Sequence, residues 1–292
     1  MIKQDVQKLS AVAAFISALV LSSCKEEDSQ RITLQDTADL TDEAVTDAYF
    51  QELDDMAGVA IKSPSDTQYS TGRVSATITI EDPRFKCQGI TVTIVPDANS
   101  TQEVPKGVLT VDFGSAGCSD LQNNVRKGKL IFTYNGKRFM PGSTVITTTA
   151  NYFINDIALE GVRTLTNLQN STSDAPRFNV VLQNGRATFP NGLSATRESN
   201  ITWQWNRATN PLDDNLKIED TSEASGVTRG GRTYQVDVVK PLFYKRQCGI
   251  PVSGLKTYLI DGEKQITIDY GDGTCDRAFS ITVNGVTREI TF

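Results

Sequence analysis

GVLTVDFGSAGCSD (Gly107–Asp120) and KQITIDYGDGTCDR (Lys264–Arg277) are two copies of one pattern in this 292-residue chain. In each copy apolar and polar residues alternate, as they do in a strand that buries one face. A glycine and then a cysteine end both copies, and another cysteine precedes each of them, Cys87 and Cys248. Because these features recur in the same order, the sequence predicts an internal structural duplication.

The same strand pattern occurs both inside the two copies and in the chain around them. The alternation recurs in Val74–Ile80, Thr91–Ile94, Leu109–Phe113, Leu130–Tyr134, Ile266–Tyr270 and Phe279–Val283. Asn-Gly pairs, which suit tight hairpin turns, occur at Asn135-Gly136, Asn184-Gly185, Asn191-Gly192 and Asn284-Gly285. The pattern predicts an all-β fold, an antiparallel β-sandwich that is immunoglobulin-like or larger. We expect this body to cover residues 67–292, with repeat units 74–139 and 234–292, as one domain or two packed halves.

The body contains four cysteines, which allow three disulfide pairings. The repeat favours Cys87–Cys118 and Cys248–Cys275, because each copy has its own upstream cysteine. Disulfides of this kind persist outside the inner membrane. A Cys₄ zinc site is the alternative, although no C-x-x-C spacing supports it.

The N-terminus has the pattern of a secretory signal. Lys3 and Lys8 precede a run of thirteen uncharged residues, 9–21, which is too short to span a bilayer. Small residues then lead to Cys24, as in a bacterial lipobox, where the cysteine is acylated and becomes the first residue. The sequence therefore predicts a lipoprotein signal peptide at 1–23 and an acylated Cys24. An ordinary cleaved signal or an uncleaved anchor is the alternative.

An acidic tail is expected at residues 24–66. Residues 25–55 hold eleven Asp and Glu against two basic residues, whereas the chain from residue 56 onward carries a net charge of +2. Apolar residues at helical spacing predict a short amphipathic helix at about 42–57, with Thr41 as its N-cap and Gly58 as its end. We expect this helix to dock on the body, with a solvated spacer as the alternative.

Four segments carry a resemblance to a known group of proteins. They are the Lys25–Asp28 acidic run after the lipobox, Phe243–Cys248, Asp269–Asp276 and Val283–Gly285. The chain resembles all-β surface lipoproteins of the Bacteroidota that have no assigned activity. This resemblance implies a lipid anchor in the outer membrane and, because the acidic run is similar to a surface-export tag, a location on the cell exterior. The periplasmic face is the alternative.

Composition excludes several classes of function. The chain contains no histidine, which removes Ser-His and Cys-His nucleophile pairs and His-ligated metal sites. Its net charge of −6 argues against a nucleic-acid partner. We expect no cofactor.

Three aspartates crowd one glycine-rich turn of the second copy, Asp269, Asp272 and Asp276. Carboxylates at this density make a weak calcium candidate. The first copy has only one acid at the matching turn, so turn-forming aspartates are the favoured interpretation.

Trp203 and Trp205 are two residues apart on an expected strand and therefore share one face. A core position is the favoured interpretation, and a ligand platform that stacks on sugar rings is the alternative. Arg197 and Arg207 are candidates for a polar rim beside the two rings.

The expected function is a non-catalytic binding or structural module that binds a glycan or a protein through loops on a rigid scaffold. The alternative is a glycan-acting hydrolase that uses a pair of carboxylates and needs no histidine. Its candidate acids are Glu160, Glu198, Glu219 and Glu223, with Asp213-Asp214 expected in a loop.

Overall fold

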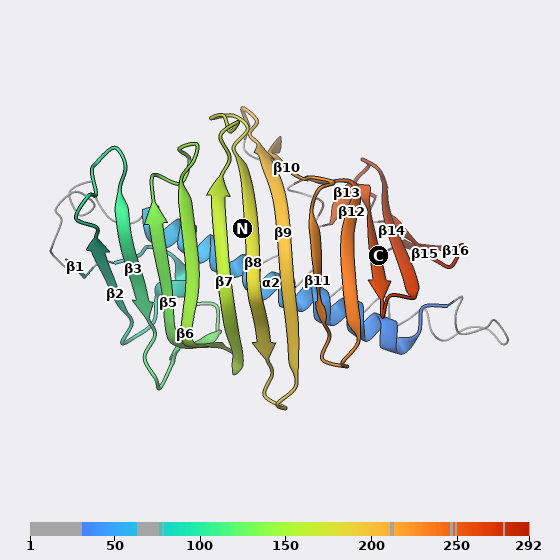
Figure 1. Ribbon diagram of the computed structural model, residues 1–292, viewed down its shortest axis with the longest axis horizontal. Helices are drawn as coiled ribbons and strands as arrows, with labels where there is room; N and C mark the ends of the chain where they lie inside the picture. The colour runs from blue at the N-terminus through green and yellow to red at the C-terminus, as the bar shows by residue number, and fades with distance from the viewer. Residues whose placement is uncertain are drawn as a thin grey trace. The chain divides into compact units, whose positions relative to one another are not determined.

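The computed structural model describes residues 31–62, 76–77, 79–210, 213–245, 248, 250–276 and 278–291 (Figure 1). The predictions for the signal peptide, for acylation of Cys24 and for the acidic run after it lie outside these residues. One long helix, α2 (Leu34–Lys62), precedes a series of antiparallel strands.

The chain divides into two compact units. We name the first the C-terminal unit, which holds the described residues of 31–48, 172–177 and 197–292. The second, the central unit, holds those of 49–171 and 178–196. The first part of α2 therefore belongs to the C-terminal unit and its remainder to the central unit.

The strands of the central unit follow the order β1-β2-β3-β5-β6-β7-β8, with β4 paired to β5. All of the pairings recorded between them are antiparallel. Their bounds are β1 (Ala76–Thr77), β2 (Thr91–Pro96), β3 (Lys106–Asp112), β4 (Cys118–Ser119), β5 (Val125–Asn135), β6 (Thr144–Ile154), β7 (Ile157–Asn167) and β8 (Arg177–Thr188), and a short 3₁₀ helix, η3 (Pro83–Phe85), lies between β1 and β2.

The strands of the C-terminal unit follow the order β9-β10-β12-β13-β14-β15-β16, with β11 paired to β12. Their bounds are β9 (Ser194–Asn206), β10 (Asn215–Ile218), β11 (Glu223–Val227), β12 (Thr233–Lys245), β13 (Pro251–Ile260), β14 (Lys264–Asp272), β15 (Ala278–Val283) and β16 (Val286–Thr291).

The prediction of an all-β antiparallel fold with a preceding helix is confirmed. The detail of two facing sheets is corrected, because in each unit the strands run through a single sheet and α2 supplies apolar residues to the core. Phe50, Leu53 and Met56 join the core of the central unit, and Leu40 joins that of the C-terminal unit. Strand alternation reports that one face is buried, but it does not report whether a sheet or a helix covers that face.

The two repeated stretches have the same local topology. The first copy pairs β3 with β2 and β5, and the second pairs β14 with β13 and β15. Each copy closes a disulfide, Cys87–Cys118 and Cys248–Cys275, with Cα atoms 5.6 and 5.5 Å apart. Both predicted pairings are confirmed. In each copy a hairpin of two strands lies between the two cysteines, and it brings the second cysteine back beside the first.

Helix α2 is longer than the sequence analysis predicts. Its N-terminus is capped at Thr33, whose Oγ1 accepts the Asp36 N–H at 3.1 Å while Asp36 Oδ2 accepts the Thr33 N–H at 2.8 Å. This reciprocal pair is a capping box with aspartate in the usual Glu/Gln position. Thr41 is not the N-cap but lies inside the helix, where its hydroxyl donates to the Thr37 carbonyl. Gly58 does not end the helix either.

Gly58 is in the helix for a steric reason. A Cβ atom at this position would lie 1.4 Å from a terminal nitrogen of the Arg138 guanidinium. A glycine there lets the guanidinium lie directly against the helix backbone. A close approach by a residue 80 positions away leaves no local signal in the sequence.

Candidate functional site

The acidic residues of α2 are directed at the strands, and each of them lies within 4.0 Å of a basic side chain. Asp36 and Asp39 are each 1% exposed, and Glu43 is 2% exposed. The pairs in the C-terminal unit are Asp36 with Arg232 and Lys264, Asp39 with Arg232, Asp42 with Arg229, Glu43 with Arg197 and Lys256, and Asp47 with Arg197. Those in the central unit are Glu52 with Arg126, Asp54 with Arg163, and Asp55 with Arg84. The helix therefore docks, and the alternative of a solvated spacer is wrong for residues 34–62.

Glu43 is the centre of a buried cluster in the C-terminal unit. Its Oε1 lies 2.5 Å from Arg197 Nη1, its Oε2 accepts the Tyr258 hydroxyl at 3.0 Å, and Lys256 Nζ lies 3.6 Å away. Burial acts to raise the pKa of Glu43, but the Lys256 and Arg197 charges outweigh it and hold that pKa below its usual range. Burial, reinforced by the Glu43 charge, raises the pKa of Tyr258 well above its usual value.

Perturbed pKa values often mark catalytic groups, so the Glu43 cluster is the first place to look for chemistry. The carboxylate, Arg197 and Tyr258 are only 2%, 2% and 4% exposed. The carboxylate is already matched by two cations and a phenol. This arrangement holds a helix to a sheet, and a substrate has no path to it through groups that are this buried.

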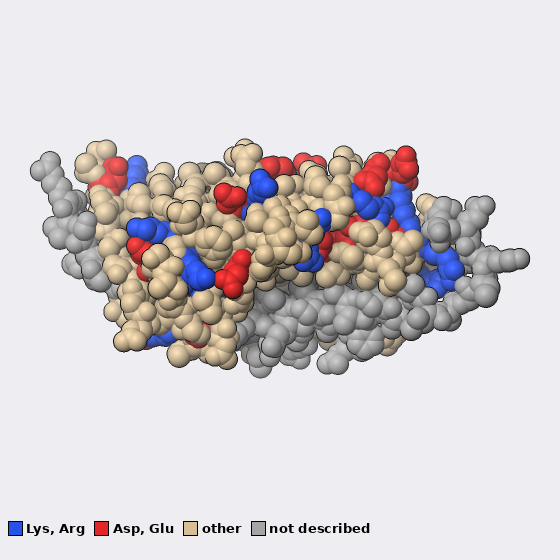
Figure 2. All heavy atoms as spheres, turned by 90° about the horizontal axis from the view of Figure 1, so that it is seen from below, with Lys and Arg blue, Asp and Glu red and all other residues tan. Residues whose placement is uncertain are grey.

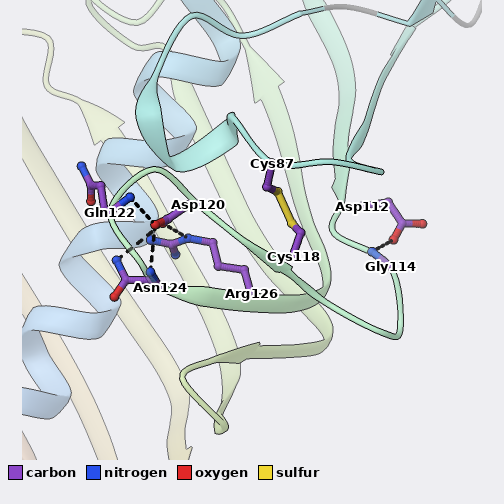
Figure 3. Close-up of a disulfide and its surroundings, with 8 residues drawn as sticks. All are labelled: Cys87, Asp112, Gly114, Cys118, Asp120, Gln122, Asn124 and Arg126. Carbon is purple, nitrogen blue, oxygen red and sulfur yellow. Dashed lines mark hydrogen bonds and ion pairs between the residues drawn. A yellow bond between two sulfur atoms is a disulfide. The ribbon is translucent and has the colours of Figure 1, made fainter.

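Arg126 is the centre of a second buried charge cluster, in the central unit (Figure 3). Its guanidinium is 0% exposed and donates to Asp120 Oδ2 at 3.0 Å, Glu52 Oε1 at 2.6 Å and Tyr152 Oη at 2.7 Å. Asp120 also accepts backbone N–H groups from its own loop. Arg126 is directly opposite Cys118 in the β4–β5 pair, so the disulfide and the charge cluster stabilise the same hairpin.

Asp55 is the carboxyl of the central unit that is poised to titrate near neutral pH. Burial raises its pKa to about 6, against the opposing charges of Arg84 and Arg138 and with a contribution from Asp54. Beside it, a cavity of about 10 Å³ is lined by residues that include Asp54, Gly58 and Arg138. This volume holds about one water molecule and is far too small for an organic ligand.

Replacing Asp55 with asparagine should stabilise the protein at neutral pH. Because the pKa of Asp55 is about 6 in the folded chain and 3.8 in the reference state, the folded chain binds more protons between these values. The free energy of unfolding therefore falls as pH rises from about 4 to 6, and the full penalty applies above pH 6. We expect Asp55→Asn to gain about 1–2 kcal/mol at pH 7.5 and nothing at pH 4 in urea unfolding.

The matched control is Asp156→Asn, which removes an exposed carboxylate paired with Lys127. In this control, the difference between the free energies of unfolding at pH 7.5 and pH 4 should be the same as in the unmodified protein. A loss of stability at pH 7.5 in Asp55→Asn would contradict the raised pKa of Asp55.

The three aspartates of the second repeat form turns. Asp269, Asp272 and Asp276 each accept a backbone N–H from the residue two positions later, at 2.9, 3.1 and 3.0 Å. This is Asx-turn geometry, the turn-forming role that the favoured interpretation gives to the three aspartates. Within the part of the chain that the structure describes, no group of three or more Cys, Asp or Glu residues is placed to hold a metal ion.

Trp203 and Trp205 are both half-buried on β9, so they are neither deep core nor an open platform. The Trp205 indole donates to Asp214 Oδ2 at 3.1 Å, and the Arg207 guanidinium lies 4.4 Å from the centre of its ring. Across the sheet Trp205 is opposite Leu216, which is opposite Tyr244. We call Trp205, Leu216 and Tyr244 the aromatic strip. Its side chains are on neighbouring strands and share one face.

The two arginines expected at the rim have different roles. Arg207 lies beside Trp205, as expected of a rim residue. Arg197 is instead buried between Glu43 and Asp47, so its assignment to the rim is wrong. Residue type and proximity in sequence could not distinguish the roles of the two arginines. Strand β9 is long, so Arg197 near its start contacts the buried face of α2, whereas its other end carries the half-exposed tryptophans beside Arg207.

The candidate catalytic acids are dispersed. Glu219 lies 2.8 Å from Arg177 and 3.7 Å from Lys217, and Asp214 accepts both the Trp205 indole and the Ala208 N–H. The others are exposed residues: Glu160 on β7, Glu198 on β9, Glu223 on β11, and Asp213 shortly before β10.

Charges of both signs are interspersed on the surface. On the face that Figure 2 shows, acidic and basic side chains of the described residues lie beside one another in small groups. Neighbouring charges of opposite sign partly cancel, so this arrangement is not the single-sign surface that steers a highly charged ligand.

The charged residues that sequence reasoning missed are the arginines and lysines that meet the acids of α2. A signal for them existed, because Asp36, Asp39, Glu43 and Asp47 recur every three or four residues and so share a helix face. A helix face that is acidic along its length needs cations opposite it when it is buried.

None of the described helices is long and apolar enough to span a bilayer. Comparison with protein-family models, curated proteins and solved structures finds no match to this chain.

Proposed function

We propose that this protein is a lipid-anchored lipoprotein of the outer membrane that faces the cell exterior and binds a glycan or protein ligand without catalysis. The lipobox at Cys24 and the acidic run after it support the address. The scaffold of disulfide-linked strands supports a rigid binding module.

The observation that carries this proposal is the placement of the perturbed acid and base groups in the Glu43 and Arg126 clusters. The buried ion pairs between α2 and strands β9 and β13 involve Glu43, Arg197 and Lys256. In the central unit, Arg126 is paired with Asp120 and Glu52. Groups engaged in this way stabilise the fold and are not available to transfer protons to a substrate. The half-buried aromatic strip, by contrast, retains accessible surface.

The aromatic strip suits a ligand with a flat apolar face. Indole and phenol rings stack on the C–H face of a sugar or on an apolar side chain, and the polar atoms at their edges orient the ligand. Asn206 and Asn215, joined by a 2.7 Å side-chain hydrogen bond, lie on the opposite face of the same strands, where they hold β9 against β10.

Screening the purified protein against a glycan array and candidate proteins, and following tryptophan fluorescence, tests this proposal. We expect Trp205→Ala to weaken binding of any ligand found by at least tenfold. Phe139→Ala removes an exposed aromatic of the central unit and should leave binding unchanged. Turnover of a glycan that is abolished by one Asp or Glu to Ala change would show that the protein is a hydrolase instead.

Replacing Cys24 with alanine should move the protein from the detergent phase to the aqueous phase in Triton X-114 partition. The thiol is the atom that carries the lipid, so its removal eliminates the anchor. Ser23→Ala keeps a small residue before the cysteine and should still partition with detergent. Unchanged partitioning of Cys24→Ala would exclude lipidation at this position.

A further inference from the structure

The two disulfides have equivalent places in the repeated hairpins, but only one of them is buried. Cys118 is 8% exposed and belongs to the core of the central unit, and Cys87 packs against that core. In the C-terminal unit Cys275 is exposed and Cys248 is partly exposed. Neither of these two is among the described residues that form the core of that unit or pack against it. The duplication therefore contains one buried and one accessible disulfide.

The segment that leads into the first cysteine of each copy explains this difference. In the first copy the chain enters Cys87 from the 3₁₀ helix η3, whose Phe85 is 4% exposed (Figure 3). The Phe85 ring stacks on Phe113 of the same core, with 6.4 Å between the ring centres. In the second copy the corresponding positions lie at the end of strand β12, which extends to Lys245, three residues before Cys248. An aromatic cover is thus built into the first copy, and a strand takes its place in the second.

Other bonds hold the segments that the accessible disulfide joins. Strands β12 and β13 pair with each other on both sides of Cys248. Two residues before Cys275, Gly273 donates its N–H to the Val252 carbonyl at 2.8 Å. The Gly273 carbonyl accepts Lys245 Nζ at 2.7 Å. Opening of this disulfide therefore leaves the strands paired, whereas a reagent reaches the first disulfide only by displacing side chains of the core.

Access to sulfur controls how fast a disulfide reacts with a thiol. The reaction begins when a thiolate attacks one of the two sulfur atoms, so a disulfide beneath core side chains is protected and an exposed one is labile. Of the two cysteines in the accessible disulfide, Cys275 is the more exposed. The sulfur of Cys275 is therefore the one that a small thiol meets first.

We propose that Cys275 is a site of thiol exchange, at which a small thiol becomes attached to the protein while the Cys87–Cys118 disulfide stays closed. The thiolate forms a new S–S bond with Cys275 Sγ, and the Cys248–Cys275 bond breaks. Its electron pair goes to Cys248 Sγ, which takes up the proton that the attacking thiol released. The attacking sulfur is oxidised and the Cys248 sulfur is reduced, so the exchange consumes no further oxidant or reductant.

The exchange is reversible. The Cα atoms of Cys248 and Cys275 are 5.5 Å apart in the closed form, and the paired strands keep them near one another after opening. The Cys248 thiol is therefore at high effective concentration beside the mixed disulfide, and its attack on Cys275 Sγ expels the small thiol and restores the original bond.

Timed exposure of the purified full chain to 2-mercaptoethanol tests this proposal, after any free thiol has been blocked. Excess N-ethylmaleimide stops the reaction, and peptide mass spectrometry locates both labels. We expect the Cys248–Cys275 disulfide to open at least tenfold faster than Cys87–Cys118. In the molecules that open first, the mercaptoethanol adduct should be on Cys275 and the maleimide on Cys248.

Two controls show whether burial is the cause. In urea that unfolds the chain, the two opening rates should come within about threefold of each other, because the protection of the first disulfide is lost. Phe85→Ala should accelerate opening of Cys87–Cys118 at least fivefold and leave the other disulfide unchanged. Phe139→Ala, which removes an exposed aromatic of the same unit, should change neither rate. Circular dichroism establishes that the variants fold, and the unmodified chain decides the proposal even if Phe85→Ala does not.

Several results would overturn the proposal. They are equal opening of the two disulfides in the folded chain, faster opening of Cys87–Cys118, and no opening of either. An adduct that forms first on Cys248 would contradict attack at Cys275. A rate difference that persists in urea would show that the neighbours in sequence, and not burial, make the second disulfide labile.

Discussion

Replacing Arg126 with methionine should lower the free energy of unfolding by about 3–5 kcal/mol. The methionine fills much of the same space but leaves Asp120, which is 3% exposed, and the Glu52 carboxylate without their cation. It also leaves the buried Tyr152 hydroxyl without its donor. An uncompensated buried charge costs more than the ion pair contributes, so this loss is expected to exceed that of an exposed pair severalfold. Urea unfolding at pH 7.5 measures it.

The control for this prediction is the next residue on the same strand. Lys127 pairs with Asp156 at 2.8 Å, but the two side chains are 33% and 67% exposed. Lys127→Met should therefore cost less than about 1 kcal/mol, because water solvates the carboxylate that remains. Equal losses in the two variants would show that the burial of the Arg126 cluster has no energetic consequence.

Replacing Gly128 with alanine should destabilise the protein by about 3 kcal/mol or more. Gly128 has a φ of +75° and lies where the β5–β6 register shifts. An added Cβ would be 1.9 Å from the Asn151 carbonyl oxygen, which is a backbone atom that cannot rotate away. Relief requires the two strands to separate at this bulge. Thermal unfolding should show a lower midpoint without a change in the fold, as monitored by circular dichroism.

Gly114→Ala separates the steric contribution from the backbone strain. Gly114 has nearly the same φ of +74°, but nothing lies within 4 Å of the position that an added Cβ would occupy. Its substitution should cost only about 1 kcal/mol, the strain of a side chain in the left-handed region. A Gly114→Ala loss as large as that of Gly128→Ala would mean that strain dominates and that the contact with Asn151 is unimportant.

Local pattern was sufficient to predict both disulfides and several of the strands, β2, β3, β5, β14 and β15 among them. A strand in a sheet repeats its environment every two residues, so its sequence reports directly which side chains are buried. The pairing of Cys87 with Cys118 and of Cys248 with Cys275 followed from the duplication, because a repeated hairpin must bring equivalent residues together in both copies. These features depend on neighbours that are close in sequence.

The expected docking of the acidic helix was confirmed, but its start at Leu34 and the burial of its first acids were not predicted, because distant residues decide them. Asp36 and Asp39 lie before the predicted start of the helix at about residue 42, so the sequence analysis did not place them on its buried face. Their shared partner Arg232 is more than 190 residues away. Burial of a carboxylate is favourable only when a cation is already positioned to meet it. The spacing of the acids indicated a shared helix face, but it could not identify the distant cations that meet that face.

The sequence by itself determined the alternation of the strands, the two disulfides and the presence of a helix before the sheet, because each of these follows from spacing along the chain. Only the tertiary structure decided that α2 rather than a second sheet covers the core, and that Arg197 is a buried partner of Glu43 and not a rim residue. These outcomes depend on which strand is opposite which and on what packs against each face. Both are set by the free energy of the whole fold and not by any single segment.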